Sequence, residues 1–126
     1  MFTGIFTWRN LVLGLASWAV PFLAAFAFFD SSGTLAIAQP LFKSLMVVIG
    51  GGVGAGLLVL AFRRIPGGLS AGFALGLFWL VLNWGLDIAL LLPMSGQGIA
   101  EWFQDIGLRY LVLLFTAMAM GSVAAR

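Results

Sequence analysis

The sequence predicts an all-α polytopic membrane protein: a four-transmembrane-helix bundle with a short interfacial amphipathic helix before the last span. Apolar residues make up 63% of the 126 residues and charged residues 8%, whereas a soluble domain is about half apolar and a quarter charged. The apolar residues gather in four continuous runs, each near the roughly 20 residues that a helix needs to cross a bilayer. We expect one membrane domain spanning residues 1–126.

The predicted spans are residues 11–29, 41–62, 69–92 and 108–125. Helices are favoured because backbone polar groups in lipid must pair within their own segment. The breaks between the runs are Asp30–Gly33, Pro40, Arg63–Gly68 and Pro93–Gly98. The turn between the second and third runs is short, so we expect those helices to be antiparallel neighbours.

The first run has a second interpretation. Arg9, the apolar stretch and Ala25-Phe26-Ala27 resemble a secretory signal with a small-residue cleavage site. The run is long for a signal peptide, which favours a retained span.

Loop charges predict the orientation of the chain. Four arginines fall on the side of the amino terminus, and two cations fall on the other side: Arg9, Arg63, Arg64 and Arg126 against Lys43 and Arg109. Cytoplasmic loops carry an excess of Lys and Arg, so both termini are expected in the cytoplasm of a bacterial or archaeal inner or plasma membrane. The small difference leaves a dual orientation open.

The segment before the last span is expected to be a short amphipathic helix. Four apolar residues recur there at helical spacing: Ile99, Trp102, Phe103 and Ile106. Glu101, Gln104 and Asp105 fall on the opposite side, which is typical of a helix lying at a membrane interface. It would be a lid on the bundle at the membrane surface or, alternatively, a docking surface or gate.

Small and polar residues form stripes on the predicted helices. On the third run Gly72, Gly76, Trp79, Asn83 and Asp87 fall within an arc of about 80°. Such a stripe should face protein or a water-filled crevice, because a polar group facing lipid is unsatisfied. Candidate close-packing glycines elsewhere are Gly50 with Gly54, Gly52 with Gly56, and Gly121 in the last run.

Charges are expected to form one layer near the outer face, composed of Asp30, Lys43, Asp87 and Arg109 with Asn83 nearby. Lys43 and Asp87 lie at similar depths if their helices are antiparallel, and a lysine stem can bridge the difference. The layer is either an ion-pair network that fixes helix register or part of a proton or ion path.

The C-terminal half carries a resemblance. It contains Gly72-x3-Gly76-x2-Trp79-x3-Asn83-x3-Asp87 and then Asp105-Ile106-Gly107-Leu108-Arg109-Tyr110. This pattern, over about residues 72–121, resembles a group of small four-helix integral membrane proteins of bacteria and archaea. The resemblance implies four helices and directs attention to Asn83, Asp87, Asp105 and Arg109, but it implies no substrate or mechanism.

Composition narrows the function classes. The chain has no Cys and no His, which removes the usual nucleophile–base pairs and the commonest metal ligands. We expect no enzyme, no cofactor and no nucleic-acid partner. The leading interpretation is a helix bundle that works by association in the lipid bilayer, as an accessory subunit of a membrane complex or as a homo-oligomer. The alternative is a small oligomeric channel or transporter that uses Asn83 and Asp87.

Overall fold

The four expected long helices form, and each is long and apolar enough to cross a membrane: Trp8–Phe28, Gln39–Phe62, Leu69–Met94 and Gly107–Ala124. The structure, a computed structural model, describes residues 5–96 and 98–125, except for the side chains of Ser95 and Asp105. Arg126 lies outside the described residues. No strand forms in the described part of the chain, so the all-helical prediction is confirmed there.

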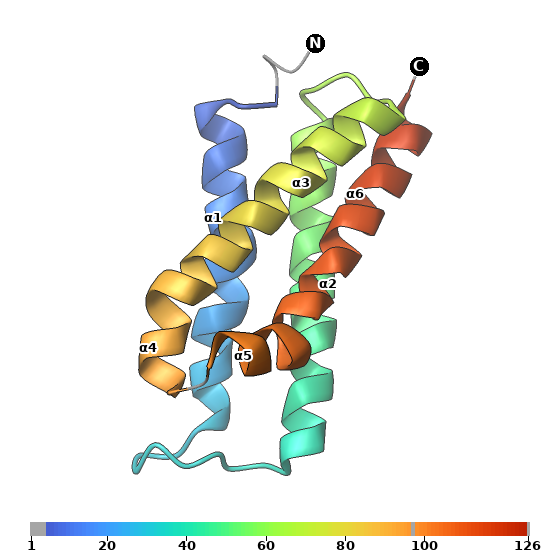
Figure 1. The fold of residues 1–126 in the computed structure, drawn as a ribbon. Helices are drawn as coiled ribbons and strands as arrows, with labels where there is room; N and C mark the ends of the chain where they lie inside the picture. Colours follow the sequence, from blue (N-terminus) through green and yellow to red (C-terminus); the bar gives the residue numbers. More distant parts are fainter. Residues whose placement is uncertain (1–4, 97, 126) are drawn as a thin grey trace.

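The helices follow one another with short connections. Their bounds are α1 Trp8–Ala25, the 3₁₀ segment η1 Phe26–Phe28, α2 Gln39–Phe62, α3 Leu69–Leu86, the π-helical segment η2 Asp87–Leu91, α4 Leu92–Ser95, α5 Ile99–Asp105, the 3₁₀ segment η3 Gly107–Tyr110 and α6 Leu111–Ala124. The start of α1 and the end of α6 lie at one end of the bundle, and α5 lies toward the other end with the loop between α1 and α2 (Figure 1).

Local sequence sets the helix ends. The hydroxyl of Thr7 caps α1 by accepting the backbone N–H of Asn10 at 3.2 Å. Pro40 occupies the first turn of α2, where its missing N–H has no helical partner to lose. Gly68 before α3 has φ 129° and Gly96 after α4 has φ 73°, values that favour glycine.

The pairs of helices differ in how closely their backbones pack. α3 packs mainly on α6 and α1, and α2 packs on α1 and α6. α2 and α3, expected to be antiparallel neighbours, share the apolar core, but their backbones lie less close to each other than to those of α1 and α6. The short turn brings only the ends of these helices together, and α3 then crosses the bundle obliquely (Figure 1). The apolar core lies between α2, α3 and α6 and includes Leu58, Phe62, Leu75, Trp79 and Ala117.

Glycines allow the close crossing of α3 and α6. A Cβ added at Gly72 would overlap the carbonyl oxygen of Ala117 and lie 2.8 Å from the Cα of Met118. One added at Gly121 would lie 2.8 Å from the Cα of Gly72, and one at Gly76 would lie 2.9 Å from the Cβ of Ala117. The helices therefore touch backbone to backbone, as small residues permit between membrane helices.

This crossing generates a stability prediction. Gly72→Ala should lower the free energy of unfolding by about 1–3 kcal/mol, the usual cost of overpacking. Gly85→Ala is the matched control on the same helix, because a Cβ there meets no atom within 4 Å. It should be neutral or stabilising by up to about 1 kcal/mol. Equilibrium unfolding in mixed detergent micelles, followed by tryptophan fluorescence, measures both, and equal effects would refute the close crossing.

Candidate functional site

A line of polar groups lies buried between α1 and α3. We name it the polar seam, and it consists of Asn10, Ser17, Trp18, Trp79, Asn83 and Asp87. All six side chains are buried. The three members on α3 and η2 belong to the stripe expected from the sequence. The stripe divides between two neighbours: Trp79, Asn83 and Asp87 face α1, and its glycines face α6.

Asp87 is the charged member of the seam. Its side chain is 1% exposed. The indole Nε1 of Trp18 donates to Oδ1 at 2.5 Å, and the indole Nε1 of Trp102 donates to Oδ2 at 3.0 Å. The side chain of Tyr110 is a further hydrogen-bond partner. An unpaired buried carboxylate is very costly, and here aromatic donors from α1, α5 and η3 offset that cost.

One turn along α3, Asn83 continues the seam. Its Nδ2 donates to the Ser17 hydroxyl at 3.0 Å and to the Trp79 carbonyl at 2.8 Å. The Ser17 hydroxyl in turn donates to the Gly14 carbonyl at 2.6 Å. The indole of Trp79 donates to the carbonyl of Asn10 at 3.0 Å. Together with the Trp18–Asp87 bond, the Ser17–Asn83 and Asn10–Trp79 bonds tie α1 to the long helix of α3 and η2 at three successive levels and so fix their register.

The backbone changes its helical pitch at Asp87. η2 begins there, and the Leu92 N–H donates to the Asp87 carbonyl five residues earlier. A π-helical turn inserts an extra residue into the helix and often marks a functional position. In this chain it lies where the seam meets α5.

The expected charge layer is spread over several elements. Asp30 lies in the loop after α1 and accepts hydrogen bonds from the Ser32 hydroxyl at 2.6 Å and the Thr34 N–H at 3.0 Å. These hydrogen bonds lower the pKa of Asp30 below its ordinary value, and the bond from the Ser32 hydroxyl has the largest effect. Lys43 and Arg109 are half-buried on α2 and η3. Both oxygens of Asp87 accept indole N–H groups, so pairing with Lys43 is not required to satisfy them and stays a prediction.

The glycines of α2 divide into two environments. A Cβ added at Gly54 would lie 3.1 Å from Leu113 of α6, so this glycine is at an internal contact. Gly50, Gly52 and Gly56 have no atom within 4 Å of such a Cβ. Gly52 and Gly56 are exposed on one side of α2, whereas Gly50 lies closer to the side of Gly54 and is half-buried.

The short helix α5 turns one aromatic side chain inward. Trp102 is 2% exposed, whereas Ile99 and Phe103 are exposed and Ile106 is half-buried. The Phe103 ring contacts the Trp84 ring edge-on at a centroid distance of 5.7 Å. Helical spacing groups Trp102 with Ile99, Phe103 and Ile106, but its buried side chain is instead part of the Asp87 site.

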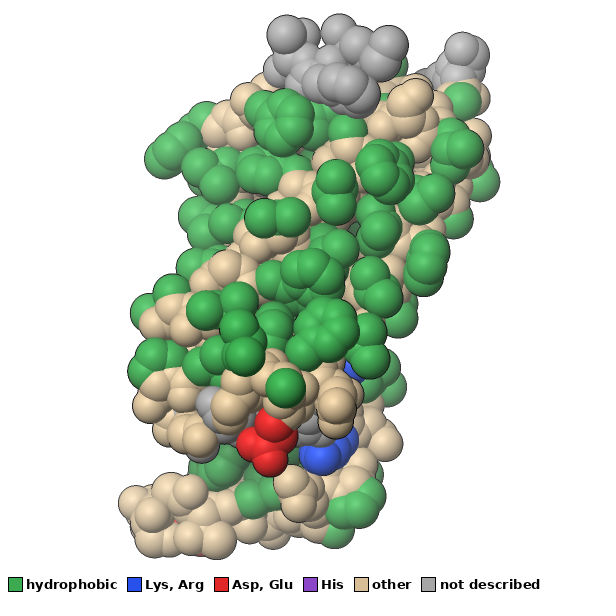
Figure 2. Space-filling model, in the orientation of Figure 1, with side chains coloured by type: hydrophobic (Ala, Val, Ile, Leu, Met, Phe, Trp, Pro, Cys, Tyr) green, Lys and Arg blue, Asp and Glu red, His purple; other side chains and the backbone are tan. Residues whose placement is uncertain are grey.

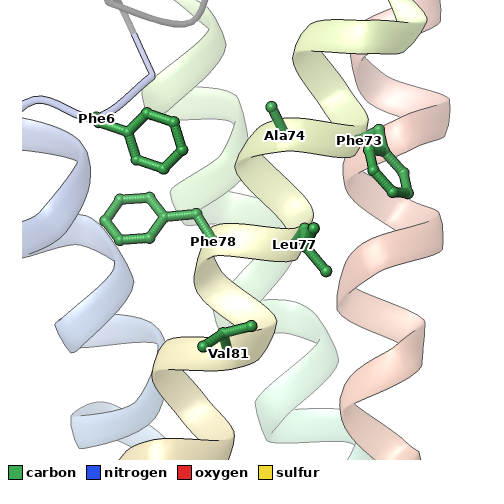
Figure 3. Close-up of a pocket in the computed structure, with 6 residues that line it drawn as sticks. All are labelled: Phe6, Phe73, Ala74, Leu77, Phe78 and Val81. Atoms are coloured by element: carbon green, nitrogen blue, oxygen red, sulfur yellow. The ribbon is translucent and has the colours of Figure 1, made fainter.

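An apolar groove of about 450 Å³ follows the outer side of α3. Its lining consists of Phe6, Phe73, Ala74, Leu77, Phe78 and Val81 (Figure 3). None of these side chains can form a hydrogen bond, transfer a proton or bind a metal. Among the described residues, no group of three or more His, Cys, Asp or Glu is placed to hold a metal ion.

Sequence reasoning did not place Trp18, Trp102 or Tyr110 at Asp87, and it assigned Trp102 to the apolar side of the interfacial helix. Periodicity counts aromatic rings as apolar surface, so it gives no information on where their polar atoms point. One signal was present in the sequence: a buried indole N–H needs an acceptor. In apolar helices the available side-chain acceptors are few, and Asp87 is one of them.

The Asp87 site generates a prediction about stability. Trp18→Phe removes a charge-assisted donor and should cost about 1.5–3 kcal/mol of unfolding free energy. Trp84→Phe is the control, because its indole donates to the neutral Gly107 carbonyl at 2.9 Å, and it should cost about 0.5–1.5 kcal/mol. The Trp18→Phe loss should shrink in an Asp87→Leu background. Unfolding in mixed micelles measures all three, and a Trp18→Phe loss unaffected by Asp87→Leu would rule out the contact.

Comparison with known proteins adds no assignment: no family model, no curated protein and no solved structure matches this chain.

Proposed function

We propose that this chain is an integral membrane helix bundle without enzymatic activity, which works by associating through α2 with a transmembrane helix of another chain. The partner is a subunit of a larger membrane complex or a second copy. Four helices of transmembrane length and apolar character support the location. The surface in Figure 2 supports it too, since apolar side chains cover the middle of this face and charges lie toward one end.

One row on α2 carries the proposal. Five residues of α2, each four positions after the one before, form an exposed row: Ser44, Val48, Gly52, Gly56 and Leu60. Such a row is a ridge that packs into the groove of a neighbouring helix. At its centre Gly52 and Gly56 form a G-x-x-x-G spacing with no atom within 4 Å of an added Cβ.

Where small residues of this chain contact another helix, the two helices cross at close range. Gly72 and Gly121 bring α3 and α6 into backbone contact. In lipid, helices associate chiefly through such close packing, because lipid tails remove the hydrophobic drive. Gly52 and Gly56 offer an equivalent surface that the chain itself leaves uncovered, which supports another helix as the occupant.

The proposed placement in the membrane follows from charge and from α5. Arg63 and Arg64 are exposed at the end of α2, which lies at the same end of the bundle as the start of α1 and the end of α6 (Figure 1). This supports that end as cytoplasmic. α5 would then lie at the outer interface, with Ile99 and Phe103 toward the headgroup region and Glu101 toward water.

The polar seam favours this proposal over the channel alternative. Both oxygens of Asp87 and the Nδ2 of Asn83 are hydrogen-bonded within the chain, and each of the two side chains is 1% exposed. From Asn83 toward the termini, the seam continues through Trp79 and Asn10, which cannot carry a proton by titration. A seam of this kind is better suited to fixing helix register than to conduction.

The test is the mass and composition of the particle extracted from native membranes into lipid nanodiscs. The parent should form a particle larger than the 13.4 kDa chain, and Gly52→Leu with Gly56→Leu should release the single chain. Gly85→Leu is the matched control, because Gly85 is also exposed with no atom near its Cβ position. A parent that is monomeric with nothing bound, or release by Gly85→Leu as well, would overturn the proposal. Identification of bound chains separates a second copy from a different subunit.

A further inference from the structure

The attachment of α5 to the rest of the bundle is narrow. Its backbone contacts lie mainly with η3, the segment that follows it. Of the described side chains on α5, Trp102 is the buried one. The helix spans Ile99–Asp105 and has glycines on both sides, Gly98 before it and Gly107 after it. Gly96, with φ 73°, precedes this unit.

Asp87 lies between α5 and the body of the bundle. On the body side Trp18 of α1 holds Oδ1, and on the α5 side Trp102 holds Oδ2. Tyr110 of η3 is the titratable group that faces the carboxylate, and the charge of Arg109 acts on Tyr110. Trp102 therefore closes the side of Asp87 that the short helix α5 covers.

The exposed surface of α5 carries polar as well as apolar side chains. Glu101 and Gln104 are exposed there, and charged side chains appear at this end of the molecule in Figure 2. Water would reach Asp87 by the shortest route if α5 moved away, because Asp87 lies near the end of the span Leu69–Met94.

We propose that α5 is a lid, and that Trp102 closes Asp87 off from the aqueous phase at this end of the bundle. When the lid is down, the Trp102 indole occupies Oδ2. When it lifts, water replaces the indole, while Trp18 keeps Oδ1 and the bundle stays assembled. The lid depends on neither the α2 association surface nor its partner, so the two proposals stand or fall separately.

Carboxyl labelling tests the lid directly. A water-soluble carbodiimide with glycine ethyl ester converts accessible carboxyl groups to amides, and peptide mass spectrometry gives a rate for each carboxylate. In the parent protein in nanodiscs, Asp87 should react far more slowly than Glu101 and Asp30, which are exposed and serve as internal references. Trp102→Gly should speed labelling of Asp87 about ten- to hundredfold, as expected when a hydrogen bond to a charged group no longer opposes local opening.

Trp18→Phe is the control that separates the lid from the loss of a donor. It also removes an indole N–H from Asp87 but leaves Trp102 in place, so labelling of Asp87 should stay slow. Gly96→Ala is a second lid variant for the case in which Trp102→Gly does not fold. A side chain at φ 73° is strained, which should raise the Asp87 rate without touching the site. Fast labelling of Asp87 in the parent would overturn the lid. An unchanged rate in a folded lid variant, or an equal rise in Trp18→Phe, would do the same.

Discussion

A carboxylate buried among apolar helices has to be hydrogen-bonded by the chain that buries it, and this need organises the bundle. Asp87 meets it with donors from three elements, the indoles of Trp18 and Trp102 and the side chain of Tyr110. Because these donors are far apart in sequence, satisfying one group holds α1, α5 and η3 against the end of α3. Asn83 with Ser17 repeats the link one turn further along. The register of α1 on α3 is thereby set by polar atoms, since apolar contacts are tolerant of sliding.

The central position of α3 follows from its two faces. Its polar side faces α1, and its glycines lie against α6, where Gly72 and Gly121 meet at backbone distance. α2 covers the remaining side of the core with Leu58 and Phe62. This arrangement uses the small residues of α3 and α6 inside the chain and leaves Gly52 and Gly56 of α2 outside it. The asymmetry is the physical basis of the proposed association, because exposed glycines weaken a helix unless they gain a close contact.

Much of this fold could be predicted from apolar runs and breakers. The four spans shift by a few residues at most, and the stripe of Asn83 and Asp87 indeed faces protein. How closely each pair of helices packs could not be predicted, because the short Arg63–Gly68 turn constrains the ends of α2 and α3 but not their crossing angle. The partners of Asp87 could not be predicted either, because the spacing of aromatic residues along a helix does not show where an indole N–H points. Likewise, G-x-x-x-G spacing does not distinguish Gly54, packed on Leu113, from the uncovered Gly52.

The most direct test of the account is to ask which face of the bundle meets another protein in the native membrane. The chain has no cysteine, so a short thiol-reactive photo-cross-linker can be placed at one position at a time. Gly52→Cys and Gly56→Cys on α2 are compared with Val112→Cys, which is also exposed but lies on α6. The account predicts one defined cross-linked product from both α2 positions and none from Val112. Equal products from all three positions, or none from α2, would contradict it.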